Sequence, residues 1–100
     1  MYKLLFHRNV EKQLSKIPRP FAEQLAQKTR QLKIDPRPSQ SKQLDREIYR
    51  LRDGDYRVVY AIFDAEEVVY VGKIERRTEK TYRNLKSILA RARIEVENQG

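Results

Sequence analysis

Two arginines flank a predicted hairpin turn and are placed to hold an anion between them. Asp-Gly between two alternating runs is a strong hairpin signal, because glycine tolerates the positive φ that a two-residue turn demands. With Asp53–Gly54 as the central pair, Arg52 lies opposite Asp55, and Arg50 lies opposite Arg57 on the same face. Like charges directly opposed in a sheet repel each other. The pair therefore predicts a bound anion, for which we favour a nucleic-acid phosphate.

A second turn adds an arginine from the next strand. A turn centred on Ala65–Glu66 pairs Phe63 with Val68, and the same register places Arg76 on the face of Arg57. Four arginines then share one end of one face: Arg50, Arg52, Arg57 and Arg76. Because side chains alternate along a strand, a slip of one residue would move Arg76 to the opposite face.

The hydrophobic period switches several times along the chain and predicts the elements that position these side chains. Strands are predicted at residues 2–7, 48–52, 56–63 and 68–74, with loop at 36–46. Helices are predicted after the candidate cap Asn9, from Pro18 onward, and from Thr81 onward. The order is βααβββα, which is one α+β domain over residues 1–100 with an antiparallel sheet.

Both faces of the predicted sheet are apolar at the end away from the arginines, so both must be covered. One face carries Val59, Ala61, Phe63, Val68 and Tyr70, and the other carries Tyr49, Leu51, Val58, Tyr60, Ile62, Val69 and Val71. We expect the two N-terminal helices to pack on one face. The C-terminal helix or a partner protein then covers the other, which leaves the arginine end open as a cleft.

The charge balance favours a polyanionic partner. The 100 residues carry a net charge of +8 with a pI near 9.9, and residues 72–93 hold eight Lys/Arg against two Glu. A solvated helix face would also carry such charge. There is no cysteine and no metal-ligand spacing, so no metal or other cofactor is expected. No apolar stretch reaches membrane-spanning length, and we expect a cytoplasmic protein with no membrane partner.

The hairpin and the segments after it resemble a known toxin family. The resemblance is carried by Leu44, Tyr49-Arg50-Leu51-Arg52, Tyr56-Arg57-Val58-Val59-Tyr60, Val71-Gly72-Lys73, the arginines that follow, and Tyr82. This layout is similar to the RelE branch of the RelE/ParE toxin superfamily. The resemblance implies the RelE-like microfold and a toxin that cleaves mRNA in the ribosomal A site. It also implies a cognate antitoxin that wraps the toxin and often displaces its last helix.

The resemblance assigns catalytic roles by position. Arg57 matches the phosphate-binding arginine of the family, Tyr82 matches the catalytic tyrosine, and Arg76 matches the second catalytic arginine. The segment from Gly72 to Tyr82 is two residues longer here than in the family. Arg77 is therefore an alternative to Arg76 as the second arginine.

Further cations are expected to bind RNA phosphate. Arg50 and Arg52 stand where the RelE pattern has two lysines, and Lys73 and Arg77 add positive charge from the predicted strand 68–74 and the segment after it. A lysine in a cationic cleft can lose its proton, whereas arginine stays charged at any working pH. Arg50 and Arg52 are therefore expected to hold phosphate and not to act as the base.

The implied chemistry is metal-free cleavage, in which the RNA 2′-hydroxyl attacks its own phosphate in line. RNA supplies the nucleophile, so the protein must position the chain, offset charge on the phosphorane and transfer two protons. The base is then Tyr82 with its phenol pKa lowered by cations, or Glu75, or Glu47 in reserve, or a group on the ribosome.

Two other functions fit the same fold. A ParE-like toxin inhibits DNA gyrase through protein contacts and needs no RNA-cleaving site. A non-catalytic relative would act only as a binding module, for instance as a co-repressor on operator DNA together with its antitoxin. The joint presence of Arg50, Arg57, Arg76 and Tyr82 favours the mRNA-cleaving toxin.

Overall fold

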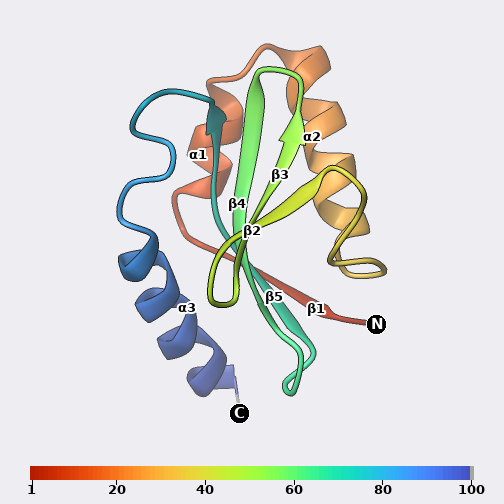
Figure 1. Cartoon of the computed structure of the whole chain (residues 1–100). Coiled ribbons are helices and arrows are strands. Elements are labelled where there is room, and N and C mark those ends of the chain that lie inside the picture. The colour runs from red at the N-terminus through yellow and green to blue at the C-terminus, as the bar shows by residue number, and fades with distance from the viewer. Residues whose placement is uncertain (100) are drawn as a thin grey trace.

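A five-stranded mixed sheet forms the centre of the molecule (Figure 1). The computed structural model describes residues 1–99, and the sheet order is β1-β5-β4-β3-β2. The strands are β1 (Lys3–Phe6), β2 (Ser41–Asp45), β3 (Ile48–Asp53), β4 (Tyr56–Phe63) and β5 (Val68–Arg76). The helices are α1 (Val10–Ser15), α2 (Arg19–Gln31) and α3 (Leu85–Gln99). The predicted α+β class is confirmed.

The sheet is mixed because β1 lies parallel to β5. Their register runs from Lys3 opposite Val68 to Phe6 opposite Val71. Parallel neighbours need a long crossover connection, and the chain between β1 and β5 supplies it. The predicted sheet was antiparallel throughout, so the pairing of this first strand is a correction.

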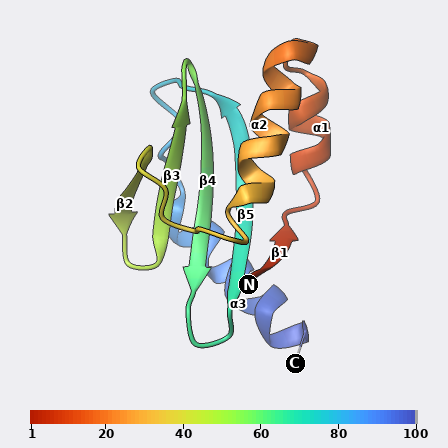
Figure 2. The same ribbon diagram turned by 90° about the vertical axis from the view of Figure 1, so that its right-hand side faces the viewer.

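The two faces of the sheet are covered by different helices (Figures 1 and 2). On one face, α1 and α2 pack Val10, Leu25 and Leu32 against alternate residues of β3, β4 and β5. On the other face, α3 packs Ala92 and Val96 against a second set that includes Phe63 and Tyr70. The expected division between the N-terminal helices and the C-terminal helix is confirmed, and α3 itself covers the face of Arg57.

The β3–β4 hairpin turns one residue later than the sequence predicts. Asp53 pairs with Tyr56, so Gly54 and Asp55 are the two central residues. Gly54 has a φ of 59°, as the first central residue of a type II′ turn requires. Asp53 stays in β3, where its Oδ1 accepts a 2.9 Å hydrogen bond from Lys28 Nζ of α2. This contact with the helix is compatible with the observed turn, in which Asp53 is still a strand residue.

This turn changes which arginines oppose each other. Arg52 lies opposite Arg57, and Arg50 lies opposite Val59. The predicted opposition of Arg50 and Arg57 is therefore wrong. The shift moves the pairing by two positions, so side-chain alternation is preserved and all three arginines still lie on the face that α3 covers.

A β-bulge at Gly72 changes the face of the residues that follow it. Tyr60 lies opposite Val71, whereas Val59 lies opposite Lys73, so Gly72 is the extra residue in β5. Beyond the bulge Arg57 lies opposite Glu75, and Arg76 lies opposite Tyr56. The predicted position of Arg76 on the face of Arg57 is therefore wrong, because the extra residue reverses the alternation.

Gly72 is also a place where α3 approaches the sheet closely. A Cβ atom at this position would lie 2.6 Å from Ile88 Cγ2 and 3.4 Å from the carbonyl oxygen of Val59. We expect Gly72→Ala to lower the free energy of unfolding by about 1–3 kcal/mol, because α3 must move outward. Urea denaturation of the purified variants measures this cost.

A double-mutant cycle identifies the cause of that cost. In a chain that already carries Ile88→Ala, the clashing methyl group is absent, so Gly72→Ala should be nearly neutral. The same cost in both backgrounds would show that Gly72 is needed for the bulge and not for the approach of α3.

Three local predictions need correction. Residues 41–45, predicted as loop, form the edge strand β2 and pair with β3 from Ser41 opposite Leu51. The side chain of Asn9 makes no capping hydrogen bond to α1. Helix α3 begins at Leu85 instead of Thr81. Within residues 1–99, none of the helices combines the length and apolarity needed to cross a membrane.

Candidate functional site

Arg57 is a buried cation at the hairpin end of the sheet. Its side chain lies on the α3 face, and the residue is only 9% exposed. Nη1 donates 2.8 Å hydrogen bonds to the carbonyl oxygens of Gly54 and Tyr56. Within the described part of the chain, Nη2 has no partner. The backbone of the turn thus holds the guanidinium in one orientation and leaves one edge for a ligand.

Tyr82 contacts this arginine directly. Arg57 Nε donates a 3.2 Å hydrogen bond to the Tyr82 hydroxyl, although 25 residues separate them in sequence. Because this bond uses a lone pair of the oxygen, the phenolic O–H remains able to donate. The structure therefore joins the two residues to which the resemblance assigned the principal roles.

The segment between β5 and α3 is shaped by two threonines that place Tyr82. Thr81 is fully buried, and its Oγ1 accepts a 2.7 Å hydrogen bond from the Thr78 backbone N–H. Thr78 Oγ1 in turn accepts from the backbone N–H of Lys80 at 3.1 Å. Sequence reasoning did not identify Thr81. A buried hydroxyl directly before a candidate catalytic residue is a signal that only burial reveals.

Charged residues form two rows across the sheet on this face. Residues directly opposite in neighbouring strands share a face. One row joins Arg52, Arg57 and Glu75, and the other joins Lys42, Arg50, Val59 and Lys73. Lys42 was missed because its strand was predicted as loop. Leu44 packs against the core under α3, and residues two apart in a strand share a face. The spacing of Lys42 and Leu44 is therefore the signal that would have placed Lys42 on this face.

The arginines of these rows are held to different degrees. Arg50 Nη1 donates a 2.7 Å hydrogen bond to the carbonyl oxygen of Gln40, whereas Arg52 is exposed. Lys73 is half-buried and lies two positions before Glu75 on the same face. The result is a cationic surface with the buried, hydrogen-bonded Arg57 at its centre and more exposed charges around it. Such a surface is suited to a phosphate chain.

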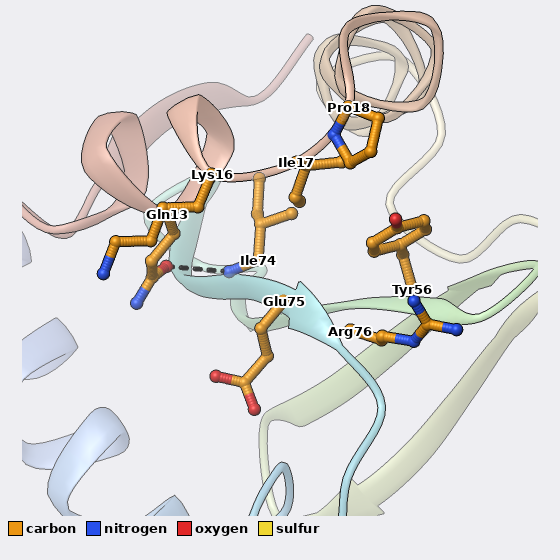
Figure 3. Close-up of a pocket in the computed structure, with 8 residues that line it drawn as sticks. All are labelled: Gln13, Lys16, Ile17, Pro18, Tyr56, Ile74, Glu75 and Arg76. Carbon is orange, nitrogen blue, oxygen red and sulfur yellow. Dashed lines mark hydrogen bonds between the residues drawn. The ribbon is translucent and has the colours of Figure 1, made fainter.

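Arg76 lies on the opposite face, beside the N-terminal helices (Figure 3). It lines a pocket of about 400 Å³ together with Gln13, Ile17 and Tyr56. The structure does not bring it to Arg57 and Tyr82. An exposed 3.5 Å ion pair joins its Nη2 to Asp55 Oδ2.

Arg77 continues the β4–β5 pairing one step beyond β5. Its backbone N–H donates a 2.7 Å hydrogen bond to the carbonyl oxygen of Asp55. Strand alternation after Arg76 places Arg77 on the side of Arg57. The side chain is exposed, and within residues 1–99 it has no partner.

The two candidate carboxylate bases have different positions. Glu75 lies directly opposite Arg57, and its side chain points away from α1 and α2 (Figure 3). Glu47 lies in the turn between β2 and β3, at the far end of the sheet, and forms an ion pair with Arg93 of α3 at 2.5 Å. The structure therefore brings Glu75 to the cationic face and not Glu47. No metal-binding group of three or more His, Asp or Glu occurs in the described residues.

The molecule is thus a small α+β domain in which a five-stranded mixed sheet carries helices on both faces and a cationic hairpin end. A family model described as the ParE toxin of the type II toxin-antitoxin system parDE matches residues 4–81. The chain therefore belongs to this family within the RelE/ParE toxin superfamily. It is a toxin of a type II toxin-antitoxin system.

Solved structures with the same fold include RelE toxins. The isolated E. coli RelE toxin is 26% identical, covers 94% of this chain and 99% of its own, and has a TM-score of 0.66. RelE in the intact E. coli RelBE complex is 27% identical over 79% and 100% of the two chains, with a TM-score of 0.64. The matched chain of the archaeal RelE-RelB complex from Pyrococcus horikoshii is 25% identical. The match covers 78% of this chain and 97% of that chain, with a TM-score of 0.66. No curated protein matches the chain.

Proposed function

We propose that this toxin is a metal-independent endoribonuclease that cleaves mRNA in the ribosomal A site. The observation that carries the proposal is the hydrogen bond from Arg57 to Tyr82 at the centre of a cationic face. A buried arginine with one unoccupied edge is suited to a phosphate, and an adjacent hydroxyl is suited to proton transfer. Similarity to RelE toxins over nearly the whole chain adds support.

The proposed reaction needs no cofactor, because RNA carries its own nucleophile. The 2′-oxygen forms a bond to phosphorus, and the bond from phosphorus to the 5′-oxygen breaks. Glu75 accepts the 2′-hydroxyl proton, and Tyr82 donates its phenolic proton to the leaving 5′-oxygen. The products are a 2′,3′-cyclic phosphate end and a 5′-hydroxyl end. Arg57 Nη2 offsets the charge that develops on the phosphorane.

The remaining cations position the RNA chain. Arg50, Arg52 and Lys73 lie on the same face as Arg57 and contact phosphates on either side of the scissile one. Arg77 takes the place of Arg76 as the second catalytic arginine, because the bulge at Gly72 turns Arg76 away. The ribosome presents the message in a fixed conformation, so cleavage of free RNA should be slow.

The partners of the toxin follow from this function. The cognate antitoxin holds the toxin inactive in the cytoplasm, and the toxin-antitoxin complex binds operator DNA. Solved relatives include RelE-RelB complexes, which supports an antitoxin partner. Expression should therefore require either a co-expressed antitoxin or an inactive variant.

Inhibition of DNA gyrase is the second candidate function, because the matching family model describes ParE toxins. Purified toxin added to translating ribosomes should cut the message at A-site codons within minutes. The same toxin should leave gyrase supercoiling unchanged. Intact message together with blocked supercoiling would replace the first function by the second, and primer extension and gel electrophoresis read the two outcomes.

A further inference from the structure

A basic hollow, separate from the cationic surface around Arg57, lies between the start of α3 and the segment that joins β1 to α1. Its volume is about 210 Å³, and its lining includes His7, Asn9, Lys73, Arg83, Asn84 and Arg91. Three of these six side chains are cationic, two are amides, and the sixth is His7. Among its lining residues there is no carboxylate. The hollow is therefore a concentration of positive charge and hydrogen-bond donors.

Two of the cations lack partners. Within residues 1–99, the side chains of Lys73 and Arg83 form no hydrogen bond or ion pair. Arg91 lies 3.6 Å from Glu95 one turn along α3, and both side chains of this ion pair are substantially exposed. Exposed i,i+4 pairs of this kind are weak. Most of the positive charge in the hollow is thus uncompensated.

The pKa of His7 responds to the positive charge in and around the hollow. Burial lowers the pKa of His7, and the nearby charges of Arg91 and Arg8 lower it further. Its Nδ1 accepts a 3.1 Å hydrogen bond from the Asn9 backbone N–H, so in the neutral ring Nε2 carries the proton. His7 is then another donor and not an acceptor, which suits an anionic ligand.

We propose that this hollow binds a backbone phosphate of single-stranded RNA, away from the scissile phosphate at Arg57. The proposal rests on the proposed function. Lys73 links the two sites, because it lines the hollow and also belongs to the cross-sheet row of Arg50. Forked guanidinium donors beside amide donors are typical of phosphate recognition. An RNA chain lying along β5 would thus be held at two points.

The test measures binding and not cleavage, in full-length toxin that carries Tyr82→Phe. The probe is a fluorescent eight-nucleotide RNA, and anisotropy gives its dissociation constant at several salt concentrations. The double variant Arg83→Gln with Arg91→Gln should weaken RNA binding about tenfold. It should also reduce the slope of the logarithm of the binding constant against the logarithm of salt concentration, by an amount equal to roughly one phosphate contact. The matched control, Arg30→Gln with Lys86→Gln, removes two exposed charges outside the hollow and should have less than about half a log unit of effect.

Two further probes separate the possible ligands. Inorganic phosphate should shift the backbone amide resonances of Asn84 and Ser87, and it should do so much less in the Arg83/Arg91 variant. Equal RNA affinity of the Arg83/Arg91 variant and the control variant would overturn the assignment to RNA. This holds even if inorganic phosphate still binds in the hollow. Poly-glutamate that binds the hollow as tightly as RNA would also overturn it, in favour of an acidic protein segment.

Failure of this inference is distinguishable from failure of the proposed function. Cleavage of message on ribosomes by the unmodified toxin establishes the function whatever the hollow binds. Arg83→Glu alone provides a second variant, because one reversed charge at an exposed position should weaken RNA binding without affecting the fold. Circular dichroism of each variant confirms that α3 is intact.

Discussion

Arg57→Ala should reduce cleavage of ribosome-bound message by at least about a hundredfold, because it removes the donors that face the phosphorane. The change should also lower the free energy of unfolding by about 1–3 kcal/mol, since the carbonyls of Gly54 and Tyr56 lose their buried partner. Single-turnover cleavage on stalled ribosomes gives the first quantity, and urea denaturation gives the second.

Arg57→Lys separates charge from geometry. Lysine keeps the positive charge but lacks the planar fork that reaches Gly54, Tyr56 and Tyr82 together. We expect the lysine variant to recover less than about a tenth of the lost rate. Full activity in either variant would mean that Arg57 is a structural residue of the turn and that another cation faces the phosphate.

Tyr82→Phe should slow the chemical step by about 10²–10⁴-fold while leaving binding nearly unchanged, because the ring remains but the proton donor is lost. The main measurement is the single-turnover rate at saturating ribosomes, over a range of pH. A substrate with a sulfur leaving atom at the 5′ position needs no protonation and should restore much of the rate.

Tyr49→Phe is the matched control for Tyr82→Phe. The Tyr49 hydroxyl also accepts a hydrogen bond from an arginine, Arg37 Nε at 3.1 Å, but it lies away from the cationic face. Its loss should not change the cleavage rate. Equal effects of the two substitutions would show that the phenol at position 82 matters only for stability. An unchanged rate in Tyr82→Phe would assign the leaving-group proton to the ribosome.

Local pattern was sufficient for most of the elements. The 3.6-residue and two-residue periods predicted the three central strands and the face of α3 that carries Leu85, Ile88, Leu89, Ala92 and Val96, all of which reach the core or pack on it. Side-chain alternation also placed Arg50, Arg52 and Arg57 on one face correctly. These features depend only on neighbours in sequence, so a single chain reveals them.

The proximity of Arg57 and Tyr82 came from the family resemblance and not from the pattern. They lie 25 residues apart, and residues 77–84, which lead from β5 to α3 and carry Tyr82, follow no regular period. Thr81, whose hydroxyl shapes that segment, carries no signal in the sequence because its importance lies in being buried. Lys42 was missed for a similar reason, since an edge strand of polar residues resembles a loop.

The sequence by itself determined the toxin family, the excess of positive charge and the faces of the strands before the bulge. Only the tertiary structure decided the turn, the bulge and the partners of each arginine. In the observed turn Asp53 stays in its strand and contacts Lys28 of α2. The bulge leaves Gly72 against Ile88, where an added Cβ atom would lie 2.6 Å from Ile88 Cγ2. Both contacts join segments distant in sequence, and a register set by such packing is not encoded in local alternation.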